Sequence, residues 1–233
     1  MRYTVLNQNK GYQLEKAKEA FVIMGTQYEK IFATGFYPAR DSTGFTEQNL
    51  VHNYSNALVQ IINESLGENG DAFAWLEFPW EDNKQHIDAI VISKYAKLVY
   101  YIEAKRLSVE QKKFQDLNND IERIKKNYDN KIIINDLLTH HKINTSSYAH
   151  HIVAMADIWV TEQPKKNKTG VHFTKNIYDS WQKTGNLSDP FIKHTHLADL
   201  LQNSQHTYVK EFTSHKNYKL LIAVESLKTP QPL

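Results

Sequence analysis

The spacing of apolar residues predicts two amphipathic helices in the first third of the chain. Apolar side chains recur at alternating steps of three and four residues, which places them on one face of a helix. In the first helix this face consists of Leu14, Ala17, Phe21, Met24, Tyr28 and Ile31. In the second helix, at about 46–65, it consists of Leu50, Val51, Tyr54, Ala57, Leu58, Ile61 and Ile62. A loop is expected between them at 35–44, because this segment contains Pro38 and two glycines.

Three segments rich in β-branched and aromatic residues follow, at 72–80, 86–93 and 98–104, and each predicts a strand. The short turn 94–97 joins the second segment to the third. Such close spacing favours strands that pair with their neighbours in sequence. We therefore expect an antiparallel meander.

The rest of the chain predicts further helices and strands within one domain. Ser108 and Gln111 have the spacing of a capping box, so a third helix is expected to begin at Ser108. The other expected elements are a strand buried on both faces at 152–160, short helices at 176–182 and 191–201, and a final strand at 219–226. No internal repeat or low-complexity linker divides the sequence. We expect a single domain over 1–233, with its core at about 45–160 and a C-terminal elaboration at 161–233.

Composition and charge narrow the class of protein. The chain has 28 Lys and Arg against 26 Asp and Glu, so its net charge of +2 neither demands nor excludes a polyanionic partner. It has no cysteine, which excludes disulfides and thiolate metal sites and favours a reducing compartment. The N-terminal residues lack the apolar core of a signal peptide, and no apolar run is long enough to span a bilayer. We expect a soluble, cytoplasmic protein without a membrane partner.

Two carboxylates and a lysine form the main candidate site. Asp88 lies within an apolar strand, where a lone carboxylate is costly to bury unless it is paired or bound to a metal. Glu103 and Lys105 are two residues apart on the next strand, so their side chains should share one face, with Ala104 opposite. Fourteen residues separate Asp88 from Glu103, enough for a hairpin that places the two carboxylates side by side.

This arrangement indicates metal-dependent hydrolysis of a phosphodiester. Two adjacent carboxylates repel each other, and a divalent cation relieves the repulsion. Their hard oxygen atoms favour Mg²⁺, for which Mn²⁺ can substitute. Such a metal lowers the pKa of a bound water and neutralises charge on the phosphate during attack. Lys105 would orient that water or stabilise the transition state.

Two further acidic residues are candidates for the neighbourhood of this site. Glu47 lies one turn before Leu50 and Val51, so its carboxylate should point toward the buried side, where it would complete the ligand set. The alternative is that Thr46 caps the helix and Glu47 is a first-turn acid that interacts with the helix dipole. The residues leave both interpretations open. Glu77, on the first strand, is expected to face water.

The order of these elements and residues resembles the PD-(D/E)xK nuclease superfamily. The signature here consists of Ile87-Asp88, fourteen residues, and then Glu103-Ala104-Lys105. The resemblance implies an α/β, restriction-endonuclease-like core with a central mixed sheet flanked by helices. It further implies a DNA endonuclease that uses Mg²⁺.

The same resemblance assigns the residues their roles. Asp88 and Glu103 correspond to the metal-binding carboxylates, Lys105 to the catalytic lysine, and Glu47 to an acid that many members carry on the preceding helix. Ile87 stands where the motif has proline, a loss that many members share. The tyrosine motif of exonuclease-type relatives is not evident in 111–128. A restriction or defence-type endonuclease is therefore expected, with DNA as partner. A homodimer is possible, and a dimer that makes paired cuts would favour restriction.

Other functions remain as alternatives. A Glu-x-Lys pair can also form an exposed salt bridge, and the fold can serve a non-catalytic nucleic-acid-binding protein or a structure-specific repair nuclease. The histidine pairs 140–141 and 150–151 lack a recognised ligand spacing for zinc. Between Glu162 and Leu220, nine lysines face five acidic residues. The lysines at 165–168 would contact phosphates or belong to a solvated loop.

Overall fold

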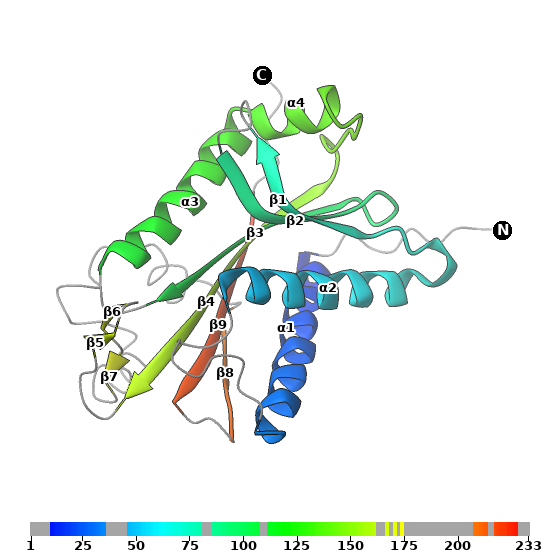
Figure 1. Cartoon of the computed structure of the whole chain (residues 1–233). Coiled ribbons are helices and arrows are strands. Elements are labelled where there is room, and N and C mark those ends of the chain that lie inside the picture. Colours follow the sequence, from blue (N-terminus) through cyan, green and yellow to red (C-terminus); the bar gives the residue numbers. More distant parts are fainter. Residues whose placement is uncertain are drawn as a thin grey trace.

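A mixed β-sheet separates two groups of helices in the computed structural model (Figure 1), so the chain has an α/β fold. The structure describes residues 10–35, 46–80, 85–107, 111–161, 166–167, 170–171, 173–174, 207–213 and 217–227. The helices are α1 (Lys10–Ala33), α2 (Glu47–Leu66), the 3₁₀ turn η1 (Gly67–Asn69), α3 (Gln111–Asp129) and α4 (Ile132–Thr139). The strands are β1 (Phe73–Trp80), β2 (Gln85–Ser93), β3 (Leu98–Leu107), β4 (Ala149–Thr161), β5 (Lys166–Asn167), β6 (Gly170–Val171), β7 (Phe173–Thr174), β8 (Thr207–Glu211) and β9 (Tyr218–Ser226).

The sheet begins with an antiparallel meander and continues with a parallel pair. Six strands follow the order β1-β2-β3-β4-β9-β8, and the short β7 pairs with β4 beside them. β1, β2 and β3 pair antiparallel, as the close spacing of these segments predicts. β3 and β4 are parallel, and the connection between them contains α3 and α4. β9 pairs antiparallel with both β4 and β8, so residues beyond 161 contribute strands to the same sheet.

Side chains of β3 alternate between two hydrophobic clusters, one on each face of the sheet. Val99, Tyr101 and Leu107 belong to the cluster that contains the buried residues of α3 and α4. The intervening residues Leu98, Tyr100, Ile102 and Ala104 belong to the cluster that contains those of α1 and α2. This period of two means that neighbouring residues of β3 serve different faces of the sheet.

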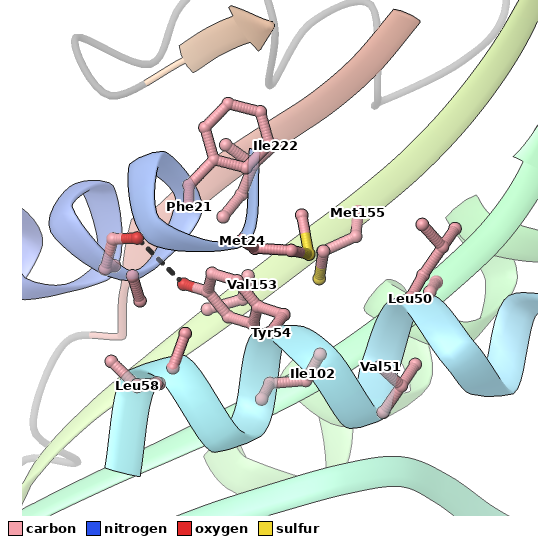
Figure 2. Close-up of a cluster of buried hydrophobic side chains, with 14 of the residues drawn as sticks. Phe21, Met24, Leu50, Val51, Tyr54, Leu58, Ile102, Val153, Met155 and Ile222 are labelled. Atoms are coloured by element: carbon pink, nitrogen blue, oxygen red, sulfur yellow. Dashed lines mark hydrogen bonds between the residues drawn. The ribbon is translucent and has the colours of Figure 1, made fainter. Parts of the chain in front are cut away.

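The face covered by α1 and α2 holds a dense apolar core (Figure 2). The buried face of α2 packs on β1, β2 and β3, where Ile102 lies below it, and α1 packs on β8 and β9. The Tyr54 hydroxyl donates to the backbone carbonyl of Ala17 across the two helices, at 3.2 Å. This packing fixes α2 over the sheet and thereby places its first turn beside the end of β3.

The apolar pattern predicted most of these elements. Both N-terminal helices, the meander, the strand at 152–160 and the final strand are present near the expected bounds. α4, β8 and the two-residue strands β5, β6 and β7 were not predicted. α4 follows Lys131, whose φ of 59° interrupts the helical path, and its run Ile132–Ile134 is β-branched and so resembles a strand in sequence. The expected cap at Ser108 and the helices at 176–182 and 191–201 lie outside the described residues.

The helices of the described ranges are amphipathic rather than apolar throughout. α1 and α2 bury one face against the sheet and expose charged residues on the other. Consequently, none of the helices in these ranges combines the length and apolar character needed to cross a membrane.

Candidate active site

Asp88 lies where the pairing of β2 is interrupted. Regular pairing with β3 begins one residue later, at Ala89, and the ladder with β1 skips Asp88 as well. Glu77 stands opposite in β1 with a φ of 50°, in the left-handed region, and its side chain is exposed, as expected. The Asp88 Oδ2 atom accepts a hydrogen bond from the Ala104 backbone N–H at 2.8 Å. The interruption therefore lets a side-chain carboxylate bond to β3 where a strand carbonyl would otherwise do so.

Glu103 and Lys105 both reach α3, as the period of the strand predicts. Glu103 Oε1 accepts from Arg123 Nη2 at 3.2 Å, and the Glu103 side chain is only 2% exposed. Lys105 Nζ forms an ion pair with Asp120 Oδ2 at 3.2 Å. Asp120 Oδ1 also lies 3.3 Å from Arg123 Nη2, so one carboxylate bridges the two cations. The structure thus brings Glu103 and Lys105 together with two residues of α3.

The environment of Glu103 disfavours its charged form. Burial raises the pKa of its carboxyl well above the usual range, and the negative charges of Asp88 and Asp120 raise it further. Lys105 and Arg123 lower the pKa but do not compensate. The carboxylates of Asp88 and Glu103 therefore lie close enough to repel each other, as two carboxylate ligands of one metal ion would.

The same negative charges favour the charged form of Lys105. Burial alone would lower the pKa of its amine, but the surrounding carboxylates outweigh burial and raise it. In decreasing order of effect these carboxylates are Asp88, Asp120, Glu103 and Glu47. A protonated amine has no lone pair, so Lys105 can donate hydrogen bonds or stabilise negative charge but cannot act as a general base.

Glu47 follows a capping residue and also turns toward the sheet. Thr46 caps α2, because its Oγ1 accepts from the Asn49 N–H at 3.2 Å. Glu47 nevertheless turns toward the sheet, where its Oε1 accepts from the Arg106 backbone N–H at 3.0 Å. The same oxygen lies 3.6 Å from Lys113 Nζ. Glu47 therefore stands at the end of β3, on the rim of the cluster rather than inside it.

The cluster on the α3 face holds more acidic than basic side chains. Asp88, Glu103 and Asp120 contribute carboxylates, whereas Lys105 and Arg123 contribute cations. No three His, Asp or Glu side chains within the described part of the chain are arranged as a metal-binding group. Two carboxylates suffice for Mg²⁺, however, since this ion commonly takes one or two of them and completes its shell with water and phosphate oxygens. The oxygen donors and the excess of acidic side chains in this cluster fit such an ion.

A second charged cluster lies on the opposite face of the sheet. The Arg106 guanidinium contacts Asp157 of β4, with Nη2 to Oδ2 at 3.1 Å and Nε to Oδ2 at 3.2 Å. The Tyr218 hydroxyl of β9 donates to the same Oδ2 at 3.0 Å. Burial raises the pKa of Asp157 to about 7, although Arg106 and Tyr218 lower it. These contacts tie β3, β4 and β9 together.

The histidines of β4 are structural. His150 lies 2.9 Å from both the Tyr101 hydroxyl and the Thr145 carbonyl, and burial lowers its pKa to about 4, so the ring stays neutral. His151 points to the other face, where it contacts Gln13 and Ser226. The two rings point to opposite faces of the sheet, and their hydrogen bonds account for both.

Sequence reasoning missed Asp120 and Arg123 as parts of the site. They flank the buried face of α3, whose members include Leu117, Ile121 and Ile124. An Asp and an Arg spaced three apart beside an apolar face were the available signal, because such residues lie along the edge of the buried surface. Only the docking of α3 on β3 shows that this edge meets Glu103 and Lys105.

Comparison with known proteins gives no match for this chain, whether with protein-family models, with curated proteins or with solved structures. The fold is therefore described as α/β with a mixed sheet, from its own topology. The chemistry must likewise be argued from the residues of the site.

Proposed function

We propose that this protein is a Mg²⁺-dependent endonuclease that hydrolyses phosphodiester bonds in DNA, in a restriction or defence role, on a restriction-endonuclease-like variant of the α/β fold. One observation carries the proposal: Asp88 accepts a hydrogen bond from the β3 backbone between Glu103 and Lys105, and the side chains of these two residues both reach α3. Two carboxylates beside a protonated lysine are the groups that metal-assisted phosphodiester hydrolysis uses.

Each residue has a role in this proposal. Asp88 and Glu103 would hold Mg²⁺, which when bound supplies an acidified water and charge neutralisation at the phosphate. Lys105 keeps its proton and would stabilise negative charge on the phosphate oxygens as the bond breaks. Glu47, on the rim, would contribute through a water rather than directly, since its Oε1 already accepts from the Arg106 N–H.

A plasmid-cleavage assay tests the proposal. The purified protein should convert supercoiled plasmid into nicked or linear DNA with Mg²⁺ or Mn²⁺ and not with a chelator. Asp88→Asn should abolish cleavage, because it removes a ligand charge. Glu68→Gln is the matched control, since it removes one carboxylate charge from the exposed 3₁₀ turn and should leave cleavage unchanged.

Assays with duplex, single-stranded and branched DNA separate the proposed role from the alternatives. Cleavage of branched DNA alone would assign the protein to structure-specific repair. Binding of DNA without cleavage of duplex, single-stranded or branched substrate would assign it to non-catalytic binding. A protein that neither binds nor cuts nucleic acid would end the proposal.

A further inference from the structure

A guanidinium contacts the most buried carboxylate of the candidate site. Arg123 Nη2 lies 3.2 Å from Glu103 Oε1, and it also donates to the His86 backbone carbonyl at 3.0 Å. Glu103 is 2% exposed at its side chain, whereas Arg123 is 23% exposed. The more exposed guanidinium therefore covers a carboxylate that is almost fully buried.

Asp120 holds this guanidinium from the same helix. Its Oδ1 lies 3.3 Å from Arg123 Nη2, and its Oδ2 lies 3.2 Å from Lys105 Nζ. Asp120 and Arg123 are one turn apart on α3, so the helix itself fixes their pairing. If Arg123 left Glu103, Asp120 and the His86 carbonyl would still keep the guanidinium at the edge of the site.

We propose that Arg123 is a counter-ion that Mg²⁺ displaces from Glu103, and that the displaced guanidinium then binds a phosphate oxygen of the substrate. This inference rests on the metal site of the proposed function. A guanidinium stays charged at all accessible pH values, so it cannot yield its place by losing a proton. A divalent cation beside Glu103 repels the guanidinium, and this repulsion weakens its contact with Oε1.

The charges of the cluster favour this exchange. When Glu103 is ionised, the three carboxylates of Asp88, Glu103 and Asp120 exceed the two cations by one negative charge. Adding Mg²⁺ leaves one positive charge in excess, and adding a phosphodiester anion returns the cluster to neutrality. Arg123 suits the last step because the planar fork of a guanidinium matches two phosphate oxygens.

The metal affinity of the free protein tests the displacement without DNA or catalysis. Mn²⁺ serves as the probe and is titrated calorimetrically into wild type and Arg123→Gln. Without the competing charge, the dissociation constant of the variant should fall on the order of tenfold, the scale of one charge–charge contact near a protein surface. Lys126→Gln is the matched control, because it removes a positive charge from an exposed position one turn away on α3, and its affinity should equal that of wild type. An unchanged or weaker affinity in Arg123→Gln, or no binding by either protein, overturns the proposal.

A measurement on wild type covers the case in which Arg123→Gln fails to fold. The chain has only four arginines, so the Nε–H signal of Arg123 can be resolved by NMR and assigned by its loss in Arg123→Lys. Saturation with Mg²⁺ should shift this signal, because the Glu103 contact is lost. A signal that does not change on saturation overturns the displacement.

A DNA-binding measurement tests the second half of the proposal. In a Lys105→Ala background, which should leave DNA uncut, Mn²⁺ should increase DNA affinity, and Arg123→Gln should reduce that increase. An equal increase in both proteins overturns the phosphate contact. Absence of DNA binding by wild type overturns the phosphate contact together with the proposed function, while the Mn²⁺ titration still decides the displacement.

Discussion

Lys105 and Arg106 are neighbours in β3, yet they belong to charged clusters on opposite faces of the sheet. Lys105 joins the α3-face cluster, in which carboxylates outnumber cations and the side chains are partly open to solvent. Arg106 joins a cluster with Asp157 and Tyr218, in which one guanidinium meets one carboxylate and one hydroxyl, and the Asp157 side chain is fully buried. Burial raises the pKa of the central carboxyl in both clusters.

The two clusters differ in charge balance and in exposure to solvent. In the Arg106 cluster each charge is matched, and its contacts connect β3, β4 and β9, so its role is to hold the sheet together. In the α3-face cluster Asp120 bridges two cations, and one negative charge remains in excess once Glu103 is ionised. An unmatched charge that solvent can reach is suited to bind a further ion. Substitutions in the Arg106 cluster are therefore expected to affect stability, whereas those in the α3-face cluster are expected to affect binding and cleavage.

The largest effect is expected from Asp157→Ala, which leaves the Arg106 charge without its carboxylate. Breaking a buried ion pair in this way costs about 3–5 kcal/mol of unfolding free energy. Arg106→Ala should cost less, because the Asp157 carboxyl can take up a proton, whereas a guanidinium cannot release one. Urea unfolding of both variants measures the difference. A loss below about 1 kcal/mol for Asp157→Ala would contradict a structural role for this cluster.

Lys105→Ala should have the opposite profile. Cleavage should fall by roughly a hundredfold or more, as when one electrostatic stabiliser of a transition state is lost. Thermal stability should change little, since the Lys105 side chain pairs with a partly exposed Asp120. Single-turnover cleavage and thermal unfolding are measured on the same preparations. Lys94→Ala, at an exposed position in the β2–β3 turn, should match wild type in both measurements. Loss of stability without loss of cleavage would place Lys105 among the structural residues.

The pH dependence of stability tests the environment of Asp157. The folded-state pKa of Asp157 is about 7, above its ordinary value of 3.8, so the folded protein retains a proton that the unfolded chain releases. The resulting stability is present below about pH 4 and is lost as the pH rises to about 7. Relative to Asp157→Asn, which cannot titrate, wild type should therefore lose unfolding free energy across this window. Parallel curves for the two proteins would show that Asp157 does not titrate there.

Local periodicity accounts for what the sequence could predict. The apolar faces of α1 and α2 and the short turn of the meander depend on residues close in sequence, and period-two alternation placed Glu103 and Lys105 on one face. The contribution of α3 depends on how that helix docks, which no local pattern encodes. The Arg106 cluster did leave a signal in the sequence, because Asp157 is a lone acid in the buried strand at 152–160, as Asp88 is in its own strand. Sequence could not separate these two carboxylates, since the charge that faces each of them comes from distant elements.

The smallest effect is expected from Glu47→Gln, at the rim between the two clusters. The Glu47 Oε1 atom accepts from the Arg106 backbone N–H, and an amide oxygen can retain this bond, so stability should change little. Its charge raises the pKa of Lys105 less than the other three carboxylates do, which indicates a weaker coupling to the site. The Mn²⁺ dissociation constant should therefore rise by about two- to fivefold, within the range of a partly screened charge. Glu103→Gln, titrated alongside, should weaken binding far more. Equal losses in the two variants would make Glu47 a direct ligand, and an unchanged constant would remove it from the site.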